Sequence, residues 1–467
     1  MAIQVSEQLE DQAEFKGALS TRSKLAVNSE QFVAQVVGLR SDTASPDQDT
    51  NDFVSNLRQL ASDRLATLSF PTTKDEEWKY TDVSALGTLT FANQPAIASR
   101  TANLEALIAN NIAPESLGNC LVFVNGKYRK DLSDTSDVTE GLVIGTLASL
   151  GDRLLPKLRS HLAQHPDAND YFASLNTACM EDVAIILAPK NLVVENPVQL
   201  LFISAPQAGE ATLITQPRCL VIAETHSQLT FVQTFVGENN HIYFTNAVTE
   251  VWLAEGAQVN HTKVQQQGNE AIHINTIAIA QAKNSVYKNQ AISFGAKISR
   301  QNLIVHQMAE QTETSLTGLA FIDDDQLADT HSCIAHNYPH GSSKQLHKCI
   351  ADGHSHAIFN GKIQVAKLAQ QTDSAQLSRN LLLSGKARVD TKPQLEIFAD
   401  NVKCAHGATV SQLDAEEIFY LQSRAIDAES AANLLTYAFA TEAITQIPIL
   451  SVQRSLSSFV LAKTKDS

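Results

Sequence analysis

The sequence predicts a mainly β protein, in which a β-helix core is flanked by an N-terminal and a C-terminal helical region. Two observations carry this prediction. The middle of the chain is rich in Val, Ile, Thr and Phe in short alternating runs, which are typical of strands. Strand–turn–strand units recur there at nearly even intervals, whereas the segments before and after it show helical periodicity.

The first region, residues 1–170, is predicted to be mainly helical. Its segment "DFVSNLRQLASDRLATLSF", residues 52–70, places apolar residues at helical spacing after a polar loop that ends in an N-cap. Pro71 then ends the helix. The next segment, "KDEEWKYTDV", carries Trp78 and Tyr80 among charged residues, and we expect both aromatic side chains to serve packing.

The second region, residues 171–412, is predicted to form the β-helix. Runs such as "QLTFVQTFV" and "INTIAIAQA" have the composition and alternation of strands. The repeated unit begins at Ala223, Ala254, Ala282 and Ala309, at intervals of 31, 28 and 27 residues, with looser echoes at Ala351 and Ala399. Coils of this length hydrogen-bond to their neighbours and bury a shared apolar stripe. A β-sandwich or a propeller is the competing prediction.

The third region, residues 413–467, is predicted to be a pair of helices. Asp414 and Glu417 form a capping-box pattern at the first helix, and Asp427 is placed to cap the second. An apolar stripe on the second helix comprises Ala431, Leu434, Leu435, Ala438 and Phe439. The pattern favours helices that pack on the β-helix and cap its open end. A surface that receives a partner is the alternative.

Composition excludes several classes of protein. The formal net charge is -15 and no dense Lys/Arg run is present, which argues against nucleic-acid binding. The six cysteines include no Cys-x-x-Cys pair, which favours a reducing compartment. No stretch approaches the roughly 20 apolar residues that cross a bilayer, and the N-terminus resembles neither a signal peptide nor a transit peptide. We therefore expect a cytoplasmic protein.

The stretch "DNVKCAHGATV" places a thiol and an imidazole two residues apart, at Cys404 and His406. On a strand, these side chains share one face. Thiolate and imidazole together suit zinc, copper or iron–sulfur chemistry, but a closed structural zinc site needs about four ligands. The pair is therefore half of a site completed elsewhere, or it is a buried cysteine beside a hydrogen-bonded histidine.

Signatures of a self-contained enzyme are missing from the sequence. It has no GxxxxGK[ST] phosphate loop, no GxGxxG after a strand, no HExxH and no GxSxG. If nucleotide energy is used, another protein must supply the ATPase. A non-catalytic scaffold is the leading hypothesis, and a metal-dependent enzyme that uses the His/Cys-rich stretch 331–356 is the alternative.

The segment "RNLLLSGKARVDTKPQLEIFADNVKCAHGATVSQLDAEEIFYLQSRAIDAESAANLL", residues 379–435, closely resembles the SufB/SufD family of the SUF iron–sulfur cluster assembly system, in its SufD form. Shorter matches are "KDEEWKYTDV", "YFASLNTA", "IAHN" and "IFNGKIQVA". Ser411 stands where glycine is common in the family, and it touches no ligand that the resemblance implies.

The resemblance implies a right-handed parallel β-helix and a complex with SufB and two copies of the ATPase SufC. SufC would dock on the C-terminal helices, with Tyr420, Arg424 and Asp427 as contacts. His406 would face a SufB cysteine, with Cys404 beside it, and hold iron or a nascent cluster transiently and only in the complex. A reduced flavin bound by the complex is reported of the family, but this chain has no motif for it. A homodimer of the isolated chain and a purely structural brace for SufB are further alternatives.

Overall fold

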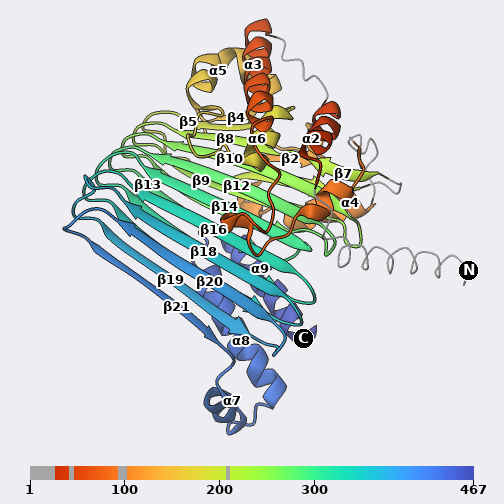
Figure 1. The fold of residues 1–467 in the computed structure, drawn as a ribbon, viewed down its shortest axis with the longest axis vertical. Coiled ribbons are helices and arrows are strands. Elements are labelled where there is room, and N and C mark those ends of the chain that lie inside the picture. Colours follow the sequence, from red (N-terminus) through yellow and green to blue (C-terminus); the bar gives the residue numbers. More distant parts are fainter. Residues whose placement is uncertain (1–26, 41–46, 93–101, 207–210, 467) are drawn as a thin grey trace, which may run out of the picture.

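Two sheets of mostly parallel strands lie face to face and form the body of the molecule (Figure 1). The computed structural model describes residues 27–40, 47–92, 102–206 and 211–466. In spatial order, sheet A contains β20 (Arg388–Ile397), β18 (His356–Val365), β16 (Leu327–His336), β14 (Ile298–Gln307), β12 (Ile272–Gln281), β10 (Tyr243–Leu253), β8 (Arg218–Ala223), β5 (Ala184–Ala188) and β4 (Val143–Thr146). In the same sheet β7 (Thr212–Thr215) pairs with β10, and β1 (Phe91–Ala92) pairs with β7. Sheet B contains β21 (Lys403–Ser411), β19 (Asp373–Leu382), β17 (Ser342–Ala351), β15 (Glu313–Ile322), β13 (Val286–Ser293), β11 (Gln258–Gln266), β9 (Gln228–Gly237), β6 (Val198–Ser204), β2 (Cys120–Val124) and β3 (Lys127–Tyr128).

Each coil gives one strand to each sheet, so the chain winds as a parallel β-helix of about seven turns. Ile272 pairs with Ile298 and His356 pairs with Arg388, so from β8 onward one coil takes between 26 and 32 residues. Parallel ladders between strands one coil apart are incompatible with a sandwich of hairpins or with propeller blades. The predicted fold class is confirmed.

The repeat in the sequence marks one corner of the coil. The units that begin at Ala223, Ala254, Ala282 and Ala309 follow sheet A strands and lead into sheet B. Each contains a residue with positive φ, at His226, Gly256, Asn284 and Gln311. A residue in this left-handed conformation turns the chain sharply, which glycine and asparagine tolerate best. The echo at Ala351 is out of phase, because it ends β17 of sheet B and lies at the opposite corner.

Polar side chains are buried between the two sheets together with apolar ones. His261 lies 2.9 Å from both the Tyr287 hydroxyl and Gln233 Oε1. Lys263 Nζ donates to Gln301 Oε1 at 3.2 Å, and within the described chain no carboxylate forms an ion pair with it. Burial lowers the pKa of Lys263 to about 7 and that of His261 to about 3, so the interior favours their neutral forms.

Helices gather at the β4–β5 end of the β-helix and along its N-terminal side (Figure 1). They are α2 (Ser29–Gly38), α3 (Gln48–Leu65), α4 (Ala102–Asn111), α5 (Leu147–His161) and α6 (Tyr171–Ala178). The predicted helix before Pro71 is present as α3, with Asp47 as its N-cap. The region is not helical throughout, because β2, β3 and β4 join the sheets. A domain boundary at residue 170 stays a prediction, and residues 1–26 lie outside the described ranges.

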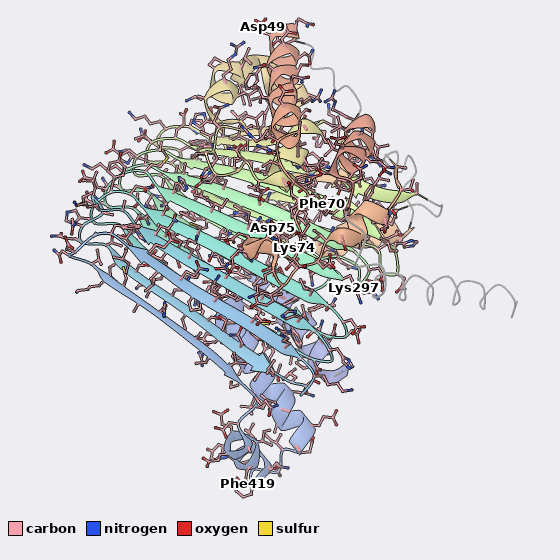
Figure 2. All side chains as sticks on the ribbon, viewed as in Figure 1. Asp49, Phe70, Lys74, Asp75, Lys297 and Phe419 are labelled. Carbon is pink, nitrogen blue, oxygen red and sulfur yellow. The ribbon has the colours of Figure 1, made fainter. Side chains whose placement is uncertain are left out.

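Residues 70–83, called the strap below, cross the outer face of sheet A, where Figure 2 labels Phe70, Lys74 and Asp75. Trp78 is buried, 5.3 Å from the Phe172 ring and with the Arg300 guanidinium 3.9 Å above its own ring. Thr81 Oγ1 donates to Asp329 at 2.5 Å, and Asp329 also forms a buried ion pair with Arg300. The packing role expected of Trp78 is confirmed.

The C-terminal region contains three helices, α7 (Ala415–Gln422), α8 (Ala428–Ile444) and α9 (Leu450–Asp466), where the sequence predicted two. The end of α8 and α9 cover the outer face of sheet B, where Ile444 and Val460 pack with Leu319 and Ile350. The expectation that the helices cap the open end of the β-helix was therefore wrong. Among the helices of the described ranges, none is long and apolar enough to cross a membrane.

The predicted apolar stripe of α8 was also wrong in part. Leu434 is 47% exposed, whereas the buried residues of α8 are Ala431, Thr436, Ala440, Ala443 and Ile444. Small alanine side chains let this part of the helix approach the sheet closely. Because α8 is apolar on most of its surface, the sequence pattern did not identify which face meets the core.

Replacing Lys263 with Met tests the neutral lysine of the interior. Between pH 7 and 10.5 the unfolded chain binds a proton on Lys263 that the folded chain does not, so this group makes the free energy of unfolding rise with pH across that window. We expect the stability of Lys263→Met relative to wild type to fall by about 1.4 kcal/mol per pH unit across the window. Urea unfolding at a series of pH values measures it. The exposed Lys344→Met is the control, and a wild-type-minus-variant difference that does not change with pH would contradict the assignment.

Candidate metal-binding and partner-binding site

The β-helix ends in two strands that each pair on one side only. Within the described chain, β20 pairs with β18 alone and β21 with β19 alone. Almost every side chain of β21 is exposed, and the turn between the two strands carries Phe398 at 69% exposure. Pro393 lies within β20, and a proline is tolerated in such an edge strand because the N–H that it lacks is not needed on the open side. The unpaired backbone groups of these strands form a surface that another strand could join.

Cys404 and His406 both lie on β21 and, as predicted, on the same face of the strand. In the ladder, Cys404 stands beside Ser374 and His406 beside Gln376, and both of these partners are buried inside the β-helix. His406 is exposed at the open end of the molecule, whereas Cys404 is half-buried. The structure therefore places the imidazole at the surface, on the inner side of the last coil.

The Cys404 thiol packs at the edge of a small apolar cluster that includes Ile363, Val365 and Leu395. Burial, with a smaller contribution from the negative charge of Asp373, raises the pKa of this thiol. A thiol binds metal as the thiolate, so Cys404 is a poor ligand in the isolated chain at neutral pH. Of the two predicted ligands, His406 is the one that is exposed.

The chain does not complete a coordination sphere around this pair. Within residues 27–40, 47–92, 102–206 and 211–466, no three His, Cys, Asp or Glu side chains gather closely enough to hold a metal ion. Two donors on a free strand leave most coordination positions open. A metal bound by this pair would need further ligands from outside the described residues.

The His/Cys-rich stretch 331–356 does not converge on one point. His331 and Cys333 lie on the outer face of sheet A, where His331 is 3.0 Å from Glu77 of the strap. His347 lies inside the β-helix and stacks on Phe359 with 4.4 Å between the ring centroids. Burial raises the pKa of the neighbouring Cys349 thiol to about 12. At the end of the stretch, His356 pairs with Asp390 at 2.7 Å. These side chains have separate local partners.

The helix α7 has no buried residue and projects beyond β21, as Figure 1 shows at the lower end of the molecule. The Arg424 guanidinium donates to the Tyr420 hydroxyl at 2.6 Å and lies 4.6 Å from the ring centroid. Tyr420 is 57% exposed, and Phe419, labelled in Figure 2, is 71% exposed. Phe419 was missed from the sequence, although it is apolar and lies on a helix with no core to pack against.

Asp427 has a structural role that the sequence predicted. Its carboxylate accepts the Ser430 backbone N–H at 2.9 Å and caps α8. Hydrogen bonds from the backbone and hydroxyl of Ser430 lower the pKa of Asp427. Asp414 caps α7 in the same way by accepting from the Glu416 N–H. The cap fixes where α8 begins.

Two family models match most of the chain. One, described as the SufBD core domain of SUF system FeS cluster assembly, matches residues 204–439, and the other, the SufBD protein N-terminal region, matches residues 39–200. The chain belongs to the SufBD family. The core model contains β8 to β21 together with α7, so the edge strands and the exposed helix are parts of the family domain.

Relatives of this SufBD chain match it in sequence over most of its length and most of their own. An iron–sulfur cluster assembly SufBD family protein of Synechocystis is 41% identical over 89% of this chain and 92% of its own length. The iron–sulfur cluster assembly protein SufD of Escherichia coli is 32% identical over 81% of this chain and 86% of its own. The chloroplastic protein ABCI7 of Arabidopsis thaliana is 32% identical over 90% and 88%.

Thiol labelling tests how the structure ranks the six cysteines of this SufBD chain. Cys404 is half-buried on an edge strand, whereas burial raises the pKa of the Cys333 thiol to about 11 and of Cys349 to about 12. We expect a maleimide to modify Cys404 roughly tenfold faster than any other cysteine in the folded protein. Peptide mass spectrometry over a time course measures it. Cys404→Ser should remove the fast phase and Cys349→Ser should not; a fast phase that survives Cys404→Ser would contradict the ranking.

Proposed function

We propose that this chain is a non-catalytic scaffold subunit for iron–sulfur cluster assembly, acting as the SufD-like partner of SufB and SufC in the cytoplasm. One observation carries the proposal: the exposed imidazole of His406 lies on an edge strand, β21, that pairs on one side only. The strand beside it, β20, is also an edge strand, and the described chain does not complete the ligand set. A site of this kind is useful only when another subunit closes it.

The open end of the β-helix would receive SufB. Strands β20 and β21 leave one row of backbone N–H and C=O groups each without strand partners in the described chain, and backbone pairing with a second β-helix would satisfy them. Exposed apolar side chains at this end, Ile397, Phe398 and Val410, would be buried by the same contact. Their burial would stabilise a heterodimer by the hydrophobic effect.

His406 would hold iron or the nascent cluster at this junction, as cargo of the complex. Imidazole suits iron, and SufB thiolates would supply the remaining ligands. A cluster held partly by a neutral imidazole should leave more readily than one held by four thiolates. Cys404, whose thiol is kept protonated by burial and by Asp373, would contribute after partner binding changes its surroundings.

The ATPase SufC would dock on α7 and the start of α8. The exposed aromatic residues Phe419 and Tyr420 provide an apolar contact surface, and Arg424 provides charge. At the other end of α8, Glu442 pairs with Lys348 on β17 and with Arg379 on β19. ATP-driven dimerisation of SufC would pull on α8, and these ion pairs would pass the movement to β19, the strand beside β21.

A reduced flavin bound by the complex and a homodimer of the isolated chain stay expectations of the resemblance. Neither is assigned to particular residues. The alternative of a metal-dependent enzyme predicts stoichiometric metal on the purified chain alone, which elemental analysis measures. The scaffold proposal expects little metal until SufB is present.

Replacing His406 with Ala tests the proposed cargo site. The side chain is exposed and makes no hydrogen bond within the described chain, so we expect folding and assembly with SufB and SufC to be unchanged. Cluster build-up in the purified complex should fall at least tenfold, because the site loses an iron ligand that no neighbouring donor replaces. Anaerobic reconstitution followed by absorption spectroscopy measures it.

His354→Ala is the matched control, because His354 is an exposed histidine in the turn between β17 and β18. It should reconstitute at the wild-type rate. Normal cluster build-up in His406→Ala would leave the chain as a structural brace for SufB and refute the role given to the imidazole.

The double variant Phe419→Ala/Tyr420→Ala tests the proposed SufC contact. Truncating exposed aromatic anchors typically costs an interface about 2 kcal/mol or more per residue, so we expect SufC to bind at least tenfold more weakly while the β-helix stays folded. Calorimetric titration with SufC measures the affinity. The control is Leu60→Ala on α3, an exposed apolar residue in the N-terminal region.

Asp427→Asn separates capping from a charged contact, because Asn also caps helices well. If Asp427 acts only as the N-cap of α8, this variant should bind SufC normally. Unchanged SufC affinity in the double aromatic variant would exclude α7 as the docking surface.

A further inference from the structure

A ladder of buried amides runs across the last coils of the β-helix and ends beside His406. Gln345 Nε2 donates to Ser332 Oγ at 2.8 Å, and Gln376 Nε2 donates to Gln345 Oε1 at 2.8 Å. Gln345 lies on β17 and Gln376 on β19, so the ladder steps one coil at a time towards the open end. The next residue in register, on β21, is His406.

The hydrogen bonds of this ladder set the directions of the two amides relative to each other, and the Ser332 hydroxyl lies within hydrogen-bond distance of both Gln345 Nε2 (2.8 Å) and Gln345 Oε1 (3.1 Å). With its Nε2 on Ser332, Gln345 presents its Oε1 to the next coil, where only a donor can meet it. Gln376 supplies that donor with its own Nε2, which leaves its Oε1 as the free end of the ladder. Reversing either amide would bring two N–H₂ groups or two carbonyls together.

Gln376 is only 2% exposed, so water does not reach its side-chain carbonyl. In the described chain that carbonyl also lacks a hydrogen-bond donor. An unsatisfied buried acceptor costs about 1–3 kcal/mol and calls for an explanation. The interior is shaped around this side chain: a Cβ on Gly361 of β18 would lie 2.2 Å from Gln376 Nε2. The amide nitrogen is therefore closely packed, and the residue in register with Gln376 on the last coil is His406.

We propose that Gln376 is a positioning residue for His406, and that its Oε1 accepts the hydrogen of the imidazole Nδ1. The two residues are ladder partners on adjacent strands, and their side chains lie on the same inner face. The structure shows no hydrogen bond between them, but neighbouring strands are about 4.8 Å apart, so a rotation of the exposed His406 side chain would bring a ring N–H to the carbonyl. The hydrogen bond selects the neutral tautomer in which Nε2 keeps its lone pair.

This inference rests on the proposed function of His406 and deepens it. A histidine that binds metal usually donates its other ring N–H to an oxygen acceptor, which fixes both the tautomer and the direction of the ring. Gln376 supplies that acceptor from within this chain, before any partner arrives. The edge strand then presents an imidazole already prepared to bind iron through Nε2.

The tautomer of His406 can be observed directly in the isolated full-length chain. Protein labelled with ¹⁵N-histidine gives long-range ¹H–¹⁵N correlations that distinguish Nδ1–H from Nε2–H, and His406→Gln identifies the resonance. At about pH 8, where an unperturbed imidazole is mostly neutral, we expect the Nδ1–H form to dominate at His406. An unconstrained histidine in water favours the Nε2–H form, and dominance of that form in the wild-type chain would overturn the proposal.

Gln376→Met removes the acceptor at nearly constant length. We expect the ratio of Nδ1–H to Nε2–H at His406 to fall about fivefold, which corresponds to a net hydrogen bond of about 1 kcal/mol. The control is Gln307→Met, since Gln307 also buries an unsatisfied Oε1 but lies on β14, which pairs with neither β19 nor β21.

An unchanged tautomer ratio in Gln376→Met would refute the positioning role even if His406 binds iron. Conversely, a normal reconstitution rate in His406→Ala would refute the cargo site even if the tautomer responds to Gln376. The two ideas therefore fail in different experiments. In the assembled complex, Gln376→Met should slow cluster build-up less than His406→Ala does, because it misdirects the ligand without removing it.

Discussion

The whole molecule depends on parallel strand pairing between one coil and the next. Each coil satisfies its backbone groups with the coils on either side, from β8 through to β21. A coil in the middle is stabilised twice, once on each side, whereas the last coil is stabilised once. The open end is thus a necessary result of the fold, and the two candidate ligands of this chain lie on it.

The interior of the β-helix is polar in places where an ordinary core would be apolar. A neutral Lys263, the hydrogen-bonded His261 and a directed ladder of glutamines occupy the space between the sheets. Such groups cost stability unless they are satisfied, and long parallel ladders of regular hydrogen bonds can tolerate that cost. The polar interior also gives the last coil a hydrogen-bond acceptor that it could not provide for itself.

Much of this architecture could be predicted from the sequence, because it rests on local rules. The repeat interval of about one coil, the alternation of strand residues, helical periodicity and capping aspartates are all visible in one dimension, and they identified the β-helix, α3 and the starts of α7 and α8. The face of α8 that meets sheet B could not be predicted, because apolar residues surround that helix. The strap was also out of reach, since the contacts of Trp78 with Arg300 and of Thr81 with Asp329 join residues that lie more than 200 positions apart in the chain.

The candidate site divides in the same way. A strand period of two was enough to place Cys404 and His406 on one face. It could not show that one side chain is half-buried with a protonated thiol while the other is exposed, because that difference comes from the apolar cluster around Leu395 and from the position of the coil. The sequence did identify Asp427 as a helix cap, but it could not show that Tyr420 and Arg424 lie on an exposed surface.

The unpaired last coil also has a consequence for the cell that makes this protein. Two adjacent edge strands, flanked by Phe398 and Val410, are a template on which further strands can add, and so a starting point for aggregation. Pro393 and the exposed Lys403 make such growth less favourable but leave most of the edge available. The isolated chain should therefore aggregate more readily than the same chain in any complex that covers this edge.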